Sequence, residues 1–242
     1  MTEPLRSTFD EELEAIKSGI LIMSNMVVET IPKGTEALLE GNLTTAQEII
    51  EADDELDALS VSLEERCYQI LTLQQPLAGD LRAVMGALWM NNEIERAGDL
   101  MTNIAKATRR IFPEKIPDVV SSLIQNMSNE AQRLLNLSSE SYLHGDSGLA
   151  AALDDIDDRL DDLNVETVEA IFEKHNDKNL TLNVAVQLAL ICRYYERIGD
   201  HAVNIGERVR YIVDGWTAER TGAARLTAVS YTHLTLPTTP YV

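Results

Sequence analysis

Apolar side chains recur along most of this chain at alternating steps of three and four residues, and this spacing constrains the fold more than any other feature. The first segment places Leu13, Ile16, Ile20, Met23 and Val27 on one face of a helix. Later segments repeat the spacing, and only 5% of the residues are aromatic. The pattern predicts an all-α protein of six long helices, which end near residues 41, 74, 111, 143, 175 and 213.

Two local signals refine this prediction near the start of the chain. Pro32 lacks an amide donor and Gly34 adds flexibility, so we expect the first helix to kink or briefly break near Ile31. At the start of the second helix, Thr45 and Glu48 have the spacing of a capping box.

The second half of the chain repeats the first. The sequence Glu-Arg-Ala-Gly-Asp at 95–99 recurs as Glu-Arg-Ile-Gly-Asp at 196–200, and Asn103 recurs as Asn204 at the same offset of 101 residues. The acidic segment 53–57 recurs at 157–161, at an offset of 104 residues. We therefore predict a tandem duplication of a three-helix bundle, with one bundle in residues 1–112 and the other in residues 113–216.

The remaining segment, residues 217–242, is expected to be a C-terminal tail. Its last part, 227–242, contains no Asp, Glu, Lys or Arg and is rich in Thr, unlike everything before it. This stretch resembles a misread gene end more than a native tail, so we exclude it, including His233, from fold reasoning.

Acidic side chains continue the apolar seam of two helices. In the third helix the stripe leads to Glu95 and Asp99, and in the sixth it leads to Glu196 and Asp200. Each pair is spaced i, i+4, so both side chains project from one face. The segments 53–57 and 157–161 contain aspartate pairs with the same spacing, and antiparallel neighbouring helices would bring two pairs opposite each other.

Carboxylates gathered in this way repel one another unless a cation binds or some of them protonate. Because no His or Cys lies within the pairs, the ligand set favours iron, manganese, magnesium or calcium over a closed structural zinc site. His201 points about 100° away from Asp200 around the helix and is not counted as a ligand. The predicted metal ligands are Asp53, Asp57, Glu95, Asp99, Asp157, Asp161, Glu196 and Asp200.

Other roles compete for the same residues. The segment 53–57 taken alone is typical of a solvated acidic face, and Glu95 and Asp99 alone fit salt bridges to Arg96 or Arg82. The recurrence of both pairs in both halves favours the metal site.

Two further repeated positions accompany the acids. Gly98 and Gly199 lie mid-helix, where glycine is unfavourable by up to about 1 kcal/mol, so we expect a close approach of the neighbouring helix. Asn103 and Asn204 follow the acids by one turn and are expected either to hydrogen-bond to them or to be plain polar seam residues.

Charge, cysteine content and missing motifs exclude several classes of protein. A net charge of −20 argues against nucleic-acid binding, and Cys67 and Cys192 are too isolated for a disulfide framework, which fits a reducing compartment. Neither a secretion signal nor an apolar run of about 20 residues is present. Phosphate loops, nucleophile elbows and Glu-x-x-His motifs are also missing, so we expect a cytoplasmic protein that is not an enzyme.

The duplicated bundles, the Glu-Arg-x-Gly-Asp motifs and the Asp-x-x-x-Asp segments resemble the PhoU family of phosphate-uptake accessory and regulatory proteins over about residues 6–216. The resemblance implies a cytoplasmic, often homodimeric adaptor, peripheral to the inner membrane through its partners. It implies multinuclear iron clusters, or zinc, manganese or magnesium, on the eight acids. It also implies two partners, the ATPase subunit of the phosphate ABC transporter and a sensor histidine kinase, and negative regulation of the phosphate-starvation response. The alternative is a metal-free helical scaffold that binds a membrane-associated partner.

Overall fold

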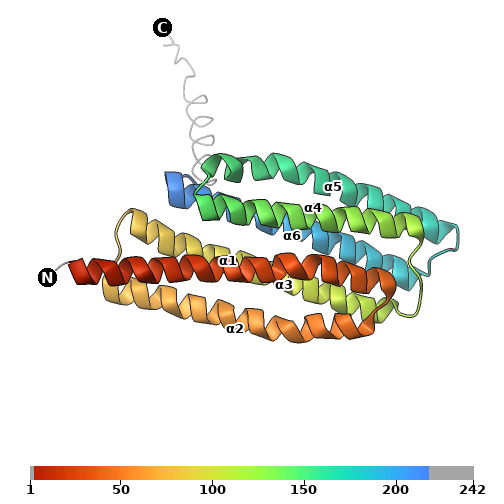
Figure 1. The fold of residues 1–242 in the computed structure, drawn as a ribbon. Helices are drawn as coiled ribbons and strands as arrows, with labels where there is room; N and C mark the ends of the chain where they lie inside the picture. Colours follow the sequence, from red (N-terminus) through yellow and green to blue (C-terminus); the bar gives the residue numbers. More distant parts are fainter. Residues whose placement is uncertain (1–2, 218–242) are drawn as a thin grey trace, which may run out of the picture.

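The structure, a computed structural model, describes residues 3–217, and the long elements in that range are all α-helices (Figure 1). The helices are α1 (Glu3–Glu40), α2 (Leu43–Gln74), α3 (Gly79–Ile111), α4 (Asp118–His144), α5 (Ser147–Asn176) and α6 (Leu182–Asp214). Each ends within one residue of its predicted position, so the all-α prediction of six helices is confirmed. The predicted tail is residues 217–242, and all of it after residue 217 lies outside the described residues.

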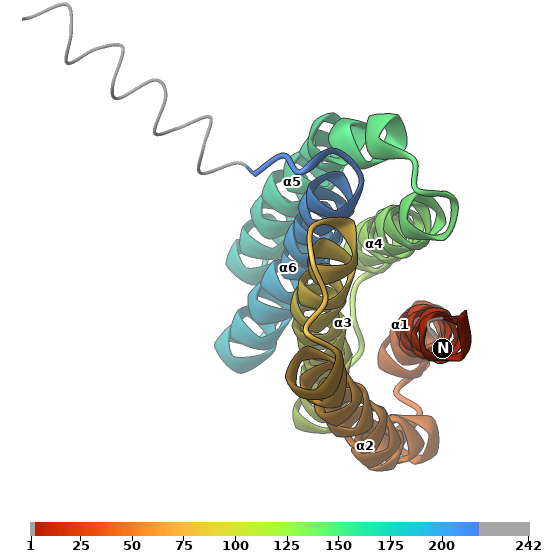
Figure 2. The ribbon, with the colours of Figure 1, turned by 90° about the vertical axis from the view of Figure 1, so that its left-hand side faces the viewer.

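The six helices form two layers (Figure 2). Helices α2, α3, α6 and α5 lie side by side in that order, and α1 and α4 cover one face of this layer. The core lies between the layers, where Met23, Met101, Met127 and Tyr195 are fully buried. The α2–α3 turn and the α5–α6 turn lie at opposite ends of the molecule, so the two halves run antiparallel (Figure 1).

The start of α2 is capped by a residue that the sequence reasoning overlooked. The side chain of Asn42 accepts hydrogen bonds from the amides of Thr44 and Thr45, both at 3.1 Å. Asn42 is therefore the N-cap, and the predicted capping box of Thr45 and Glu48 is wrong.

Helix α1 runs unbroken through Pro32, so of the two outcomes predicted near Ile31, a kink or a break, the break is wrong. A proline cannot donate to the carbonyl four residues earlier, which is that of Val28. The side-chain amide of Gln132 on α4 donates to this carbonyl instead, at 3.0 Å. Gly34 does not loosen the helix either, because a Cβ there would lie 2.6 Å from Met101 Cε, so the glycine allows α1 to approach α3 closely.

Buried hydroxyl groups also link α1 to the second half. Thr35 Oγ1 lies 2.6 Å from Ser128 Oγ on α4 and 2.7 Å from the hydroxyl of Tyr195 on α6. Because a buried hydroxyl without a partner is costly, this network fixes the position of α1 against both helices.

Candidate metal-binding carboxylates

The first group of predicted ligands lies on the antiparallel pair α2 and α3. Asp53 and Glu95 are half-buried, whereas Asp57 and Asp99 are exposed. Burial raises the pKa of Asp53, a hydrogen bond with Thr102 partly offsets this, and the charges of Asp57 and Asp99 raise it further. Burial also raises the pKa of Glu95, followed by the charges of Asp99 and Asp57. The four carboxylates therefore lie within electrostatic reach of one another.

The second group, on α5 and α6, contains the most strongly perturbed carboxylate of the eight. Asp157 is only 8% exposed, and its Oδ1 atom has no hydrogen-bond partner within residues 3–217. Burial, followed by the charges of Asp161 and Asp200, raises the pKa of Asp157 to about 7. The pKa of Asp161 is raised by its own desolvation and by Asp200. Three of the four predicted ligands in this half thus form a repulsive cluster.

Besides its deeper burial and its additional acidic neighbours, one difference between the repeats contributes to the stronger perturbation of the pKa of Asp157 relative to its counterpart Asp53. Asp53 receives a hydrogen bond from Thr102, which stabilises its charged form. At the offset of 101 residues, the position of Thr102 is occupied by Val203, which has no hydroxyl group. The second half therefore buries a carboxylate without the donor that the first half supplies.

The fourth acid of the second group has a cationic partner. The guanidinium group of Arg193 pairs with Glu196, and its Nη2 atom lies 3.9 Å from Asp200 Oδ2. In the first half the corresponding residue is Asn92, which accepts a hydrogen bond from Arg96 Nε at 2.8 Å. Glu196 thus forms an ion pair, but with Arg193 rather than with Arg197, the counterpart of Arg96.

The two mid-helix glycines allow the acidic helices to approach each other, as predicted. A Cβ on Gly98 would lie 2.2 Å from Leu56 Cδ2, and one on Gly199 would lie 2.3 Å from Asp157 Oδ1. Only a residue without a side chain permits either contact. Gly199 in particular makes room for the buried carboxylate.

The side chains do not form a complete coordination shell as they stand. Among residues 3–217, no three Asp, Glu, His or Cys side chains come close enough together to hold a metal ion. The four outer aspartates, Asp57, Asp99, Asp161 and Asp200, are exposed and have room to change rotamer. The metal ligands therefore stay a prediction.

Sequence reasoning missed a polar cluster that joins the two halves. Glu93 Oε2 on α3 lies 2.7 Å from His201 Nδ1 and accepts a hydrogen bond from Asn204 at 3.0 Å, both on α6. Burial raises the pKa of Glu93, but the contacts with His201 and Asn204 and the charge of Arg208 outweigh it, so the net shift is downward. The partners lie more than 100 residues apart in the chain, so no local pattern could have revealed them.

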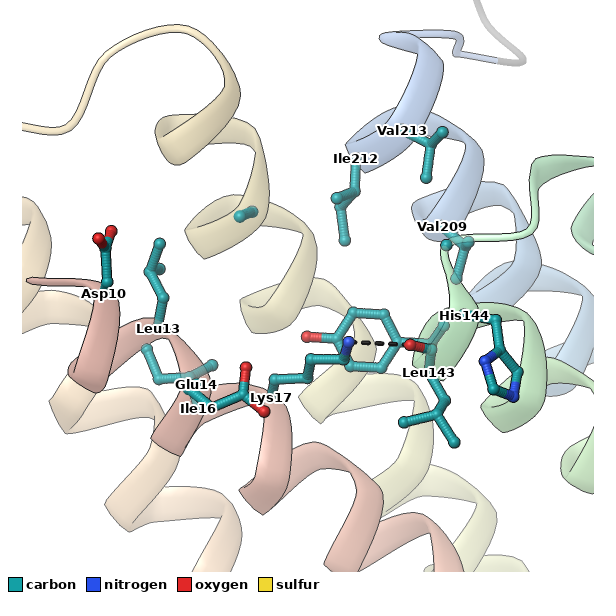
Figure 3. Close-up of a pocket in the computed structure, with 13 residues that line it drawn as sticks. Asp10, Leu13, Glu14, Ile16, Lys17, Leu143, His144, Val209, Ile212 and Val213 are labelled. Carbon is teal, nitrogen blue, oxygen red and sulfur yellow. Dashed lines mark hydrogen bonds between the residues drawn. The ribbon is translucent and has the colours of Figure 1, made fainter.

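A cavity of about 390 Å³ lies away from the eight predicted metal ligands, between α1 and the C-terminal ends of α4 and α6 (Figure 3). Apolar side chains such as Leu13 and Ile212 line it, and Lys17 Nζ at its edge donates to the carbonyl of Leu143 at 2.8 Å. Lysine there satisfies a carbonyl at the end of α4, which is a structural role.

Within residues 3–217, none of the helices combines the length and the apolar character that a membrane span requires.

The family model of the PhoU domain matches residues 20–108 and again residues 124–209 of this chain. A Mycobacterium tuberculosis protein named phosphate-specific transport system accessory protein PhoU homolog 2 is 31% identical over 212 residues, covering 87% of this chain and 99% of that protein. A Thermotoga maritima PhoU homolog 1 is 31% identical over 207 residues, covering 86% and 89%.

Solved structures show the same fold. The phosphate transport system regulatory protein PhoU from Streptococcus pneumoniae superposes with a TM-score of 0.80 at 24% identity, covering 87% of this chain and 99% of that one. PhoU from Pseudomonas aeruginosa gives a TM-score of 0.80 at 25% identity, covering 86% and 100%. The two domain matches fall in the two halves that the repeat defines.

Proposed function

Because this chain belongs to the PhoU family of phosphate transport accessory proteins, we propose that it acts as a metal-binding cytoplasmic adaptor that regulates phosphate uptake. In this role it restrains the phosphate ABC transporter through the ATPase subunit and acts, as a homodimer, with the phosphate-sensing histidine kinase. The outcome is negative regulation of the phosphate-starvation response.

The observation that supports metal binding is the repetition of four carboxylates on facing helices in each half. Burial, and after it the charges of neighbouring acids, raise the pKa values of Asp53, Glu95 and Asp157, which is the situation that a bound cation relieves. The partnerless Oδ1 atom of buried Asp157 is a further ligand-type oxygen. The donor set consists of oxygens alone, which suits iron, manganese or magnesium in a non-catalytic role.

In this proposal each half holds one metal cluster. Asp53, Asp57, Glu95 and Asp99 hold the first, and Asp157, Asp161, Glu196 and Asp200 hold the second. A bound cation supplies positive charge between the helices. The exposed aspartates change rotamer to complete each shell, and Arg193 leaves Glu196 when the second shell forms.

Metal content tests the proposal directly. We expect purified protein to contain iron, manganese, zinc or magnesium by elemental analysis, and the variant Glu95→Gln, Asp99→Asn, Glu196→Gln, Asp200→Asn to lose it. The matched control, Asp54→Asn with Asp158→Asn, removes exposed acids of the facing helices α2 and α5 that are outside the predicted ligand set, and it should keep the metal. Metal-free wild-type protein of undiminished stability in metal-supplemented medium would contradict the proposal.

The second candidate is a metal-free helical scaffold, and the pairing of Arg193 with Glu196 and Asp200 favours it in the second half. A bacterial strain that lacks its own PhoU protein separates the two candidates. We expect this chain to repress a phosphate-starvation reporter in high phosphate and the four-acid variant to lose repression. A scaffold would repress equally well in both forms.

A further inference from the structure

The uncovered face of the four-helix layer carries a set of large apolar side chains that recurs in both halves. They lie near the α2–α3 turn in the first half and near the α5–α6 turn in the second. Patch 1 consists of Val61, Tyr68, Leu81, Met85 and Trp89. Patch 2 consists of their counterparts Val165, Phe172, Leu182, Val186 and Leu190, at the offsets of 104 residues for α5 and 101 for α6.

Exposure is similar in the two halves at three of the five pairs of positions, whereas Leu182 is more exposed than Leu81 and Val186 more exposed than Met85. Val61 is 55% exposed and Val165 is 60% exposed. Tyr68 is 51% exposed and Phe172 is 60% exposed. Scattered single apolar residues on a surface are ordinary, but five repeated at corresponding positions, spaced i, i+4, i+8 on α3 and α6, form an organised face.

Patch 1 borders a groove of about 460 Å³ between α2 and α3, with Tyr68 and Trp89 in its walls. Trp89 is held in place by Tyr211, whose ring centroid is 5.3 Å away, and by the guanidinium of Arg208, 5.1 Å from the ring. A fixed aromatic side chain in a groove is the usual anchor of a protein interface. Because α1 packs on the other face of α2 and α3, the groove lies on the face that α1 leaves uncovered.

Charge identifies the occupant. The groove of patch 1 contains Glu64 and Glu93 together with Arg208 of α6, and the exposed acid Glu65 lies one helical turn from Val61 on α2, so acids outnumber bases there. The whole chain carries a net charge of −20. A second copy of this chain, or an anionic membrane, would bring like charges together at the patch, which is costly. A helix with an apolar face flanked by Lys or Arg matches both the groove and its charge.

We propose that patches 1 and 2 are two equivalent docking sites for basic amphipathic helices of a partner protein. The proposal rests on the adaptor role proposed above and assigns the contact surface for it. Because the patches lie at opposite ends of an antiparallel duplication, one chain binds two partner helices at once (Figure 1).

The probe is a synthetic 18-residue helical peptide with leucines on one face and lysines beside them, measured at 150 mM salt by isothermal titration calorimetry. We expect two peptides per chain. A scrambled peptide of equal composition, and one with Glu in place of Lys, should bind at least tenfold more weakly. In the Trp216→Phe background, tryptophan fluorescence reports occupancy of patch 1 through Trp89.

Variants assign each site. We expect Trp89→Ala to remove or weaken one site about tenfold or more, Leu190→Ala to do the same at the other site, and the double variant to lose both. Ile22→Ala and Val119→Ala, exposed apolar positions outside the patches, are the matched controls and should bind normally. Circular dichroism melting checks that every variant is folded.

Three results would overturn the proposal: equal binding of the scrambled peptide, unchanged binding by the folded double variant, or a double variant that instead changes from dimer to monomer by light scattering. The phosphate-starvation reporter strain distinguishes failure of the docking proposal from failure of the proposed adaptor role. Repression by wild type and by the double variant alike refutes the docking sites alone. Absence of repression by wild type refutes the proposed function itself.

Discussion

The hydrogen bond from Gln132 to the carbonyl of Val28 makes a quantitative prediction about α1. Replacing Gln132 with Met keeps the length of the side chain but removes the donor, so the carbonyl opposite Pro32 loses its partner. A buried carbonyl without a partner costs about 1–3 kcal/mol. Gln132 is half-buried and water reaches part of the site, so we expect the low end, about 1 kcal/mol, or about 2–4 °C in melting temperature.

The replacement Pro32→Ala tests the reason for this cost. It restores an amide donor in α1 for the Val28 carbonyl, so Gln132→Met should then cost less than about 0.5 kcal/mol. The assay is urea unfolding followed by circular dichroism for wild type, both single variants and the double variant. Gln125→Met, which removes an exposed hydrogen bond to Asn129 on the same helix, is the control and should change stability by less than about 0.5 kcal/mol.

The free energy of coupling decides the outcome. If Gln132→Met costs the same with proline and with alanine at position 32, then Gln132 does not replace the missing amide donor, and the account of the unbroken helix is refuted.

Three further predictions concern the carboxylates. Gly199→Ala should destabilise the fold by about 1–3 kcal/mol, because the added methyl group meets Asp157 Oδ1. The control Gly79→Ala, with no contact closer than 4.0 Å, should leave stability unchanged, and equal denaturation midpoints for the two variants would contradict the prediction. The pKa of Asp157 is raised from 3.8 to about 7 in the folded protein, so the folded state binds this proton more tightly than the unfolded state does. With a chelator present to remove metal ions, the free energy of unfolding should therefore fall as the pH rises from 4 to 8. Asp157→Asn should make this fall smaller. Arg193→Asn copies Asn92 of the first half and should tighten manganese binding in the second half by equilibrium dialysis; unchanged or weaker binding would show that Arg193 does not compete with the metal.

The helices and the repeat could be predicted because their determinants are local and periodic. The stripe from Leu13 to Val27 defines a helix face regardless of what packs against it. Gly98 and Gly199 were interpretable for the same reason, since a mid-helix glycine signals a close neighbour without identifying it. Only the structure identifies these neighbours as Leu56 and Asp157.

Two of the errors and omissions depend on contacts between the halves. Pro32 breaks a helix by local rules, and only Gln132, 100 residues later in the chain, reverses that expectation. Glu93 pairs with His201 across the interface of the halves, a contact that no local pattern contains. The pairing of Glu196 with Arg193 is by contrast a local i,i+3 contact within α6, and the comparison of the repeats hides it because the first half has Asn92 in place of Arg193.

The hydroxyl network of Thr35, Ser128 and Tyr195 has a consequence for dividing the molecule. A gene cut at the repeat boundary would leave Thr35 on one fragment and its two partners on the other, with polar groups facing an exposed apolar surface on both. We therefore expect the separate fragments to aggregate or to recombine with each other. A circular permutant that opens the chain between Gly145 and Asp146 keeps all three groups in one polypeptide and should remain soluble.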